Sequence, residues 1–298
     1  MNVETGANPP ARLPAFSAYL ALIKFRLLTL VLVSTCMGYF ISADNNSTLV
    51  ALLYTLVGTT MVGGGANTLN QWKERNADAQ MFRTRMRPLP AARVKPVYAL
   101  VFGLAISLLG FLVIALGVNN MTLLLSFLSW ASYLFLYTPL KTRSILNTWV
   151  GAVPGSLPAV LGCTAASGVL GNEAWALFLI LYVWQMPHFF AISWVYREDY
   201  LRGGFRMLSW NDETGTNTAI HILVHTIILL PVSAGLYLTG DFGMVYLLLT
   251  LLNGLVFLWY AIAFTQSTDK AGARKVFQYS ILYLPLVFVA IFLDRLLA

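Results

Sequence analysis

Residues 95–141 read KPVYALVFGLAISLLGFLVIALGVNNMTLLLSFLSWASYLFLYTPLK, and this stretch decides the fold. No charged residue stands between Lys95 and Lys141, and the pair Asn119-Asn120 divides the stretch into two apolar halves. Each half, at about 20 residues, is long enough to cross the hydrocarbon core of a bilayer as an α-helix. The stretch therefore predicts two antiparallel transmembrane helices joined by a short turn.

The same spacing of basic residues recurs along the chain. Lysine and arginine are absent from residues 27–72, 96–140, 144–196 and 207–269, and each of these intervals can hold two membrane spans. The apolar stretches are long and lack the alternation of barrel strands, so they predict helices. We expect an all-α polytopic membrane protein with about nine transmembrane helices, near residues 18–43, 49–69, 95–117, 121–139, 148–168, 173–195, 217–239, 242–265 and 276–297.

Composition and charge support a membrane protein. The chain is 58% hydrophobic and only 10% charged, whereas a soluble domain has about 25% charged residues. The net charge of +7 does not indicate nucleic-acid binding, because the basic clusters all fall on one side of the predicted spans and only Arg295 is left for the other. The positive-inside rule makes the basic side cytoplasmic, with the N-terminus inside and the C-terminus outside.

No shift in composition divides the chain. Residues 1–15 are polar and contain proline, so we expect a short disordered cytoplasmic tail, followed by a single transmembrane domain over 16–298. Cys36 and Cys163 stand alone within apolar spans, which favours a packing role over a disulfide or a soft-metal site.

The loop after the second predicted span begins with oxygen-bearing residues at helical spacing. Asn70, Glu74 and Asp78 are four residues apart, so they share one face if the helix continues through them. Mg²⁺ prefers one or two carboxylates together with substrate phosphates and retained waters. The spacing therefore predicts a magnesium site, whereas a solvated cytoplasmic loop would account for neighbouring arginines only.

Cations that suit a diphosphate surround this predicted site. The guanidinium fork of arginine matches phosphate oxygens, and lysine supplies a point charge. The candidates are Lys73, Arg83 and Arg87 around the first loop, and Lys141 and Arg143 at the inner end of the fourth span. The alternative is that Lys141 and Arg143 only set the topology.

A second polar loop follows the sixth predicted span. Glu198 and Asp199 emerge on the same side of the membrane as Asp78, so we expect them to supply a second set of oxygen ligands. The alternative is a pair of ordinary interfacial acids.

Histidines within the apolar spans are further candidates. His188 follows Pro187 and is flanked by Trp184, Phe189, Phe190 and Trp194. A polar residue at membrane depth is a functional candidate, although a hydrogen bond to a neighbouring helix also accounts for it. His221 and His225 are four residues apart and suit either a metal or haem ligand pair or, as we favour, helix packing.

These motifs resemble a known family. The pattern Asn70-Gln71-x-x-Glu74-x-x-x-Asp78 is similar to the first Asp-rich motif of the UbiA-type intramembrane prenyltransferases. Three further stretches resemble the protohaem IX farnesyltransferase (haem O synthase) branch, and the likeness covers essentially the whole chain. They are Met81-x-Arg83-Thr84-x-x-Arg87-Pro88-Leu89, Trp184-Gln185-x-Pro187-His188-Phe189 and Tyr196-Arg197-Glu198-Asp199-Tyr200.

The resemblance implies a helical bundle around a central cavity that opens to the cytoplasm, in a bacterial inner membrane. It implies transfer of a farnesyl group from farnesyl diphosphate to a vinyl group of haem B, with addition of water, giving haem O and diphosphate. In that reaction Mg²⁺ would be held by Asn70, Glu74, Asp78, Glu198 and Asp199, and haem would lie near His188, Trp184 and Trp194. Haem A synthase or a terminal-oxidase assembly would be the downstream partner.

Two other functions are consistent with parts of the sequence. One is a sibling prenyltransferase with a quinone-precursor or chlorophyll-like acceptor. The other is a secondary transporter with a cytoplasmic anion site, but transporters place their sites near the bilayer midplane on interrupted helices. The acids here fall at helix ends on one face, which favours an enzyme.

Overall fold

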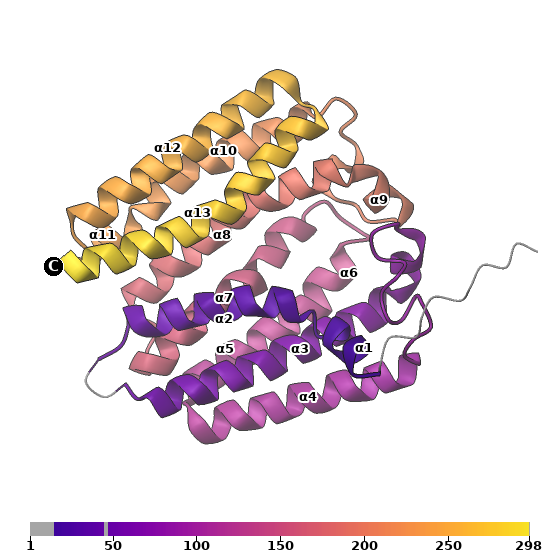
Figure 1. Ribbon diagram of the computed structural model, residues 1–298, viewed down its shortest axis with the longest axis horizontal. Helices are drawn as coiled ribbons and strands as arrows, with labels where there is room; N and C mark the ends of the chain where they lie inside the picture. The colour runs from indigo at the N-terminus through magenta and orange to yellow at the C-terminus, as the bar shows by residue number, and fades with distance from the viewer. Residues whose placement is uncertain (1–14, 45–46, 298) are drawn as a thin grey trace, which may run out of the picture.

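The computed structural model describes residues 15–44 and 47–297. The predicted disordered tail, residues 1–15, lies outside the described residues except for Ala15, where the first helix begins. All secondary-structure elements of the described chain are helices, joined by loops and turns (Figure 1). In order, the elements are α1 (Ala15–Leu22), α2 (Phe25–Ile41), α3 (Leu49–Gln80), α4 (Pro96–Gly117), α5 (Asn120–Ala131), the π-helix η1 (Ser132–Tyr137), α6 (Thr138–Leu140), α7 (Asn147–Ser167), α8 (Asn172–Val195), α9 (Arg197–Arg202), the 3₁₀-helix η2 (Leu208–Trp210), α10 (Thr216–Ser233), α11 (Gly235–Leu238), α12 (Met244–Ser267) and α13 (Lys270–Leu297).

The predicted set of spans is confirmed. Within the described residues, eight helical segments are long and apolar enough to cross a membrane, or nine if α1 and α2 are one span bent by 52°. The segments α5, η1 and α6 form one of these spans, and α10 continues into α11 to form another. The chain is therefore an integral membrane protein.

The helices form two groups that meet along α7 and α8. Figure 1 shows α10, α12 and α13 on one side of α8 and α3, α4 and α5 on the other side of α7. The helix α7 packs against both α2 and α8, so it joins the two groups. Cys36 and Cys163 are both free, as expected for packing residues.

Small residues allow α2 and α7 to approach closely. A methyl group at Gly162 would overlap the carbonyl oxygen of Thr35, and one at Gly38 would overlap the carbonyl oxygen of Ala159. Such small residues are common where membrane helices meet. Helices in lipid gain little from the hydrophobic effect when they associate, so close van der Waals contact is the main source of stability.

We predict that Gly162→Ala destabilises the protein by about 2 kcal/mol, because one helix must shift to relieve the overlap. The measurement is thermal unfolding in detergent. Gly235→Ala is the matched control, since the nearest atom to its added methyl group is Ala176 Cβ at 3.8 Å, an ordinary contact. Equal unfolding temperatures for the two variants would show that α2 and α7 are not this close.

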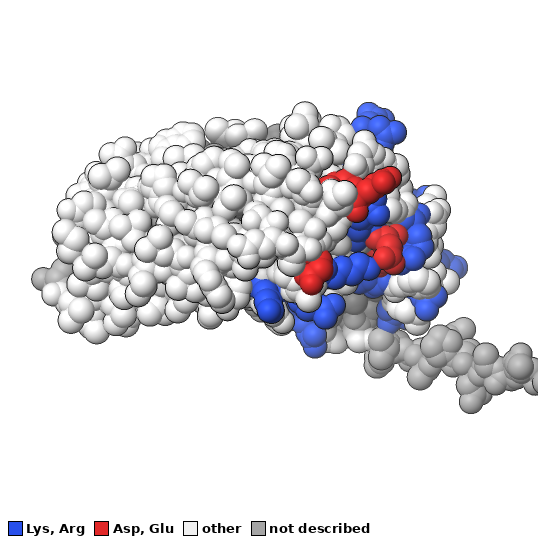
Figure 2. All heavy atoms as spheres, turned by 90° about the horizontal axis from the view of Figure 1, so that it is seen from above, with Lys and Arg blue, Asp and Glu red and all other residues white. Residues whose placement is uncertain are grey.

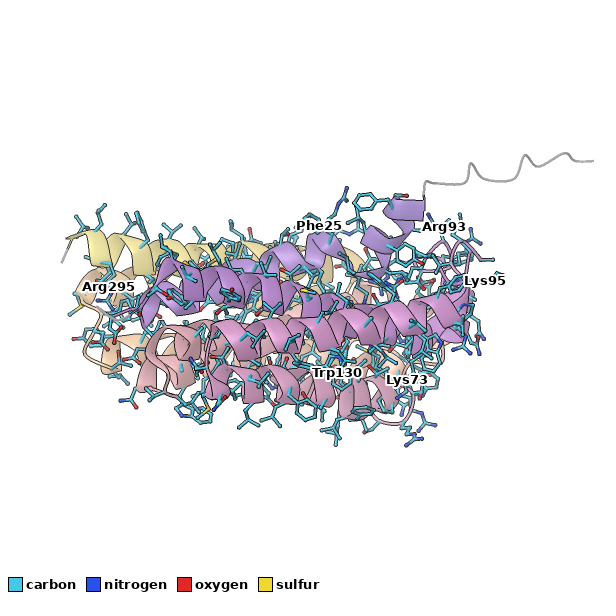
Figure 3. The ribbon with its side chains drawn as sticks, turned by 90° about the horizontal axis from the view of Figure 1, so that it is seen from below. Phe25, Lys73, Arg93, Lys95, Trp130 and Arg295 are labelled. Atoms are coloured by element: carbon cyan, nitrogen blue, oxygen red, sulfur yellow. The ribbon has the colours of Figure 1, made fainter. Side chains whose placement is uncertain are left out.

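Most of the charged side chains gather at one end of the bundle, which we call the charged end. Figure 2 shows lysines, arginines and acids together there. In Figure 3, Lys73, Arg93 and Lys95 are labelled at this end, and Arg295 lies at the opposite end. The long polar loops after α3 and α8 thus meet at the charged end. The spacing of the basic residues predicted that these loops lie on the same side of the membrane.

Candidate active site

The helix α3 carries the predicted ladder of oxygen ligands on one buried face. It continues to Gln80, well beyond the apolar stretch that ends near residue 69, so Asn70, Glu74 and Asp78 lie on successive turns. Their exposed fractions are 0%, 8% and 0%. Polar residues in such positions require partners, because an unpaired buried charge is costly.

Each member of the ladder has a partner from another part of the chain. Arg87 Nη1 donates to both carboxylate oxygens of Asp78, at 2.9 and 2.8 Å. Lys141 Nζ forms an ion pair with Glu74 Oε1 at 2.8 Å. Lys24 Nζ donates to Asn70 Oδ1 at 3.2 Å. We call these six residues the α3 cluster.

The end of the α5–η1–α6 span positions Lys141 in this cluster. The π-helix η1 precedes Pro139, and Thr138 Oγ1, which donates to the carbonyl of Tyr133, accepts from Asn70 Nδ2 at 3.2 Å. The Lys141 ammonium lies 4.5 Å from the centre of the Tyr137 ring. Burial lowers the pKa of Lys141, but the charge of Glu74 outweighs burial and the net pKa is raised. Lys141 therefore stays protonated.

Lys24 is a member of the cluster that the sequence did not single out. It lies in the break between α1 and α2 with φ 55°, a left-handed conformation that residues other than glycine rarely adopt. Lys24 lies within the first predicted span, near 18–43, and its sequence context indicated no role beyond membership of the N-terminal basic cluster. One sequence feature could have identified Lys24 as a candidate: it stands, with Arg26, at the start of a long apolar stretch.

The two acids of the second loop have different surroundings. The Asp199 carboxylate is buried and accepts from the backbone N–H groups of Phe82 and Arg83, both at 3.0 Å. The Glu198 side chain is 66% exposed and pairs with Lys270 at 2.7 Å. The structure therefore brings Asp199 to the first loop, whereas Glu198, predicted to share the cation site, faces outward.

Three of the five predicted diphosphate residues also lie outside the cluster. Lys73 is exposed and donates to the carbonyl of Leu134 at 3.3 Å. Arg83 lies over the Tyr196 and Tyr200 rings, at 4.8 and 5.2 Å. Arg143 is exposed, and its carbonyl accepts from Arg206 at 3.3 Å. Of the predicted set, Arg87 and Lys141 are the residues that contact the acids.

The donor atoms of α3 fit a magnesium ion. Among residues 15–44 and 47–297, no three histidine, cysteine, aspartate or glutamate side chains converge on one point. The ladder instead supplies two carboxylates and one amide oxygen from a single helix face. Mg²⁺ commonly takes this kind of incomplete protein set, because substrate phosphates and waters complete its coordination.

The aromatic residues around His188 form a separate group between α8 and α13. The rings of Trp184 and His188 are stacked with centres 5.0 Å apart, and Phe277 lies 5.2 Å from His188. His188 Nδ1 is 2.7 Å from Ser280 Oγ, which is the hydrogen bond between helices that the sequence left open. Trp194 lies apart from this group, and its Nε1 donates to the carbonyl of Thr268 at 2.9 Å.

His221 and His225 lie on another side of α8, against α7. Their rings pack with those of Trp149 and Phe190, with centres between 5.1 and 6.2 Å apart. His225 Nδ1–H donates to the carbonyl of His221 at 2.7 Å. This arrangement agrees with the favoured packing role.

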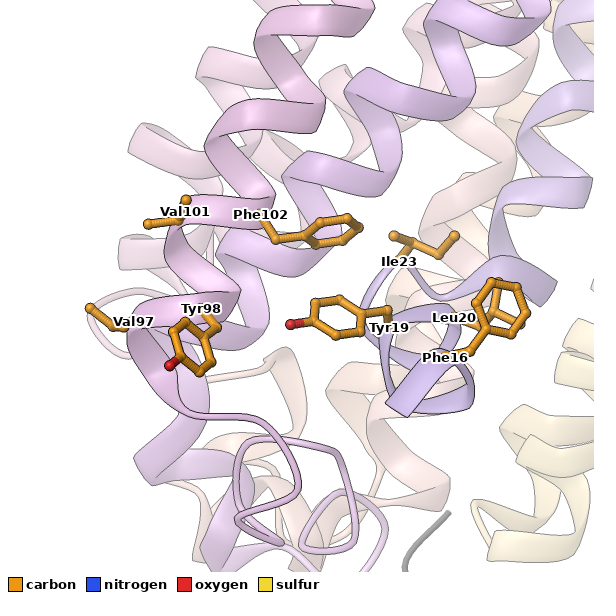
Figure 4. A pocket seen from close by; sticks show the side chains of 8 residues that line it. All are labelled: Phe16, Tyr19, Leu20, Ile23, Val97, Tyr98, Val101 and Phe102. Atoms are coloured by element: carbon orange, nitrogen blue, oxygen red, sulfur yellow. The ribbon is translucent and has the colours of Figure 1, made fainter. Parts of the chain in front are cut away.

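A pocket of about 790 Å³ lies between α1 and the start of α4. Its lining is apolar apart from the hydroxyl groups of Tyr19 and Tyr98, and Figure 4 shows these two side chains on α1 and α4. None of the α3 cluster lines it. It is therefore an apolar groove separate from the α3 cluster and lacks the cations that a diphosphate needs.

Comparisons with known proteins identify the family of this chain. The UbiA prenyltransferase family model matches residues 31–289. The protoheme IX farnesyltransferase of Solibacter usitatus is 44% identical over 286 residues, covering 93% of this chain and 98% of that protein. The protoheme IX farnesyltransferase of Salinibacter ruber is 40% identical over 267 residues, with 90% and 94% covered.

Solved structures share the fold. A digeranylgeranylglyceryl phosphate synthase superposes with a TM-score of 0.79 at 17% identity, covering 94% of this chain and 98% of that one. A UbiA homolog from Archaeoglobus fulgidus bound to GPP and Mg²⁺ superposes with a TM-score of 0.63 at 15% identity, with 92% and 99% covered. At these identities the likeness is one of fold alone.

The fold and the α3 cluster define a helical integral membrane protein with a buried cluster of acids and cations at one end of its bundle. The family model and the two relatives each match most of the chain. The chain belongs to the UbiA prenyltransferase family, and it is a prenyltransferase enzyme.

Proposed function

We propose that this enzyme transfers the farnesyl group of farnesyl diphosphate to a vinyl group of haem B, with addition of water, and releases haem O and diphosphate. The observation that carries the proposal is the α3 cluster. On one helix face, Asp78 contacts Arg87, Glu74 contacts Lys141, and the Asn70 amide contacts Lys24. The acceptor is suggested by relatives whose name is protoheme IX farnesyltransferase.

The cluster suits the departure of a diphosphate. Breaking the allylic carbon–oxygen bond leaves negative charge on the leaving group, and fixed cations stabilise that charge in the transition state. We assign this role to Arg87 and Lys141. Asn70, Glu74 and Asp78 would hold Mg²⁺, which when bound supplies further stabilisation of the same charge.

The acceptor side is assigned to the aromatic group on α8. Haem needs a flat apolar surface, and the stacked rings of Trp184 and His188 offer one beside Phe277. Trp194 is held away by its own hydrogen bond, so we give it a supporting role at most. By the positive-inside rule we place the charged end in the cytoplasm of a bacterial cell, with the C-terminus outside.

We predict that His188→Ala weakens haem B binding by about tenfold, because the change removes a ring that stacks on Trp184 and a group able to bind the iron. The measurement is a haem titration of the purified protein, followed by its absorbance spectrum. His225→Ala is the control, since its ring packs against α7. Unchanged haem affinity in His188→Ala would remove this residue from the acceptor site.

The deciding experiment is incubation of the purified enzyme with haem B, radiolabelled farnesyl diphosphate and Mg²⁺, followed by pigment chromatography. We expect label in a pigment more apolar than haem B, and its mass should show one added water. Parallel reactions with a quinone precursor and with a chlorophyll-like acceptor test the sibling activities. Label in either of those products, with none in haem, would replace the proposed acceptor.

A further inference from the structure

The span formed by α1 and α2 is broken at Lys24. The two helices meet at an angle of 52°, and Lys24 has a φ of 55° in the break between them. A left-handed conformation is strained for a residue other than glycine, and it persists only where the surroundings enforce it. Contacts from a neighbouring helix must therefore hold the chain in this conformation.

The break releases backbone carbonyl groups at the end of α1. In a continuous helix, the carbonyls of Leu22 and Ile23 would accept from the N–H groups four residues later. Leu27 N–H donates instead to the carbonyl of Lys24 at 2.8 Å, so the Ile23 carbonyl loses its helical donor. Broken helices in membrane proteins are tolerated because neighbouring groups satisfy the freed backbone.

Two amide side chains of α3 supply these new partners. Gln71 Nε2 donates to the carbonyls of Ala21 and Leu22, at 3.1 and 2.7 Å. Asn67 Nδ2 donates to the carbonyl of Ile23 at 3.1 Å. Asn67 and Gln71 are 5% and 1% exposed, and their spacing of four places them on one helix face. Three successive carbonyls of the break are thus satisfied from a single face of α3.

The backbone of α3 lies close to the break at the same level. A Cβ at Gly64 would lie 3.2 Å from Ile23 Cγ2 and 3.3 Å from Ile23 Cβ, so a larger residue would push the two segments apart. The other amide atom of Gln71, Oε1, is buried and has no hydrogen-bond partner within residues 15–44 and 47–297. The two bonds to α1 are therefore what orients the Gln71 side chain.

The break determines where the Lys24 ammonium lies. Its Nζ donates to Asn70 Oδ1 at 3.2 Å, and Asn70 Nδ2 donates to Thr138 Oγ1 at 3.2 Å. A right-handed backbone at Lys24 would redirect its Cβ and with it the side chain. The amides of α3 thus hold both the backbone of residues 21–23 and the ammonium of the residue that follows.

We propose that Asn67 and Gln71 are positioning residues. Their amide groups hold the α1–α2 break, and the break places the Lys24 ammonium in the α3 cluster, where it contributes to binding of the diphosphate. This role rests on the diphosphate site proposed above and not on the identity of the acceptor.

The first test is Gln71→Met, which keeps the length of the side chain and removes both donated bonds. We expect the dissociation constant for inorganic pyrophosphate with Mg²⁺ to rise about tenfold, because the displaced Lys24 ammonium no longer supplies a charge-assisted hydrogen bond. The measurement is calorimetric titration of the purified protein in detergent. Asn67→Leu should change binding in the same direction, and it takes the place of Gln71→Met if that variant does not fold.

Asn253→Leu is the matched control. Asn253 Nδ2 also donates to a backbone carbonyl of another helix, that of Tyr283 at 3.0 Å, and the residue is 7% exposed. This bond joins α12 to α13, so its loss should lower the unfolding temperature and leave pyrophosphate binding unchanged. Equal weakening of binding in Asn253→Leu and Gln71→Met would show general destabilisation and would overturn the proposal.

The reactivity of Lys24 supplies a readout that needs no substrate. In Gln71→Met, an amine-reactive reagent should acylate Lys24 about tenfold faster than in the wild type, because local opening exposes a group that was packed. Mass spectrometry of the Lys24 peptide measures the rate, and the exposed Lys275 is the internal reference. Unchanged acylation of Lys24 in folded Gln71→Met would show that the amide does not hold the break.

Lys24→Gly separates the backbone of the break from the ammonium. Glycine adopts a positive φ without strain, so the unfolding temperature should be no lower than that of the wild type. Pyrophosphate binding should nevertheless weaken about tenfold, since the cation is lost. Wild-type pyrophosphate binding in Lys24→Gly would overturn the proposal. If the wild type itself did not bind pyrophosphate, the diphosphate site would fail, whereas the acylation rates would still report on the break.

Discussion

Asp78→Asn should lower turnover by about 10³-fold, the largest effect that we expect from a single substitution, because it acts on charge stabilisation in the transition state. The change removes one of the two ladder carboxylates and the double contact with Arg87. Both the Mg²⁺ site and the orientation of a diphosphate-binding cation are therefore lost together. The measurement is farnesyl transfer over a series of Mg²⁺ concentrations.

The fold should survive this change. The Arg87 side chain is 30% exposed, so it can turn to water when its partner is lost. Asp241→Asn, at an exposed acid near the opposite end of the bundle, is the control. Thermal unfolding in detergent verifies that both variants are folded. Wild-type turnover of Asp78→Asn at limiting Mg²⁺ would remove this residue from the mechanism.

Lys141→Met should lower kcat by roughly 10²-fold, because one of the cations that stabilise the leaving diphosphate is lost. It should also lower stability by about 3 kcal/mol, since it leaves the Glu74 carboxylate buried without its partner. The Lys141 and Glu74 side chains are only 13% and 7% exposed, so water cannot replace the lost charge. Turnover and thermal unfolding measure the two effects separately.

A double variant separates folding from catalysis. Adding Glu74→Gln to Lys141→Met removes the unpaired charge, so we expect most of the stability to return while turnover stays low. If turnover returned with stability, Lys141 would have only a structural role. If Lys141→Met alone were as stable as the wild type, the ion pair would not be buried as the structure places it.

Much of the fold could be predicted from the sequence because membrane spans are a local property. The 45 residues between Lys95 and Lys141 are long and apolar enough for two spans whatever surrounds them. The spacing of Asn70, Glu74 and Asp78 is local in the same sense. Once α3 continues through them, their shared face follows from helix geometry alone.

The partners of these residues could not be predicted, because they come from distant parts of the chain. Lys24 reaches Asn70 from a break between helices, and its left-handed backbone has no clear signal in the sequence. By residue type, five cations were equal candidates for binding the diphosphate: Lys73, Arg83, Arg87, Lys141 and Arg143. Only the packing of the loops shows which cations face the acids.

The sequence by itself determined a helical membrane protein, most span boundaries to within a few residues, and the end of the bundle at which most acids and cations gather. The main exception is α3, which continues to Gln80 although its predicted end was near residue 69. The tertiary structure alone decided that Asp199 faces inward and Glu198 outward. Neighbours on a helix point about 100° apart, so two adjacent acids face different directions. Which one faces the first loop depends on how α9 docks against the end of α3, a contact between residues more than a hundred positions apart.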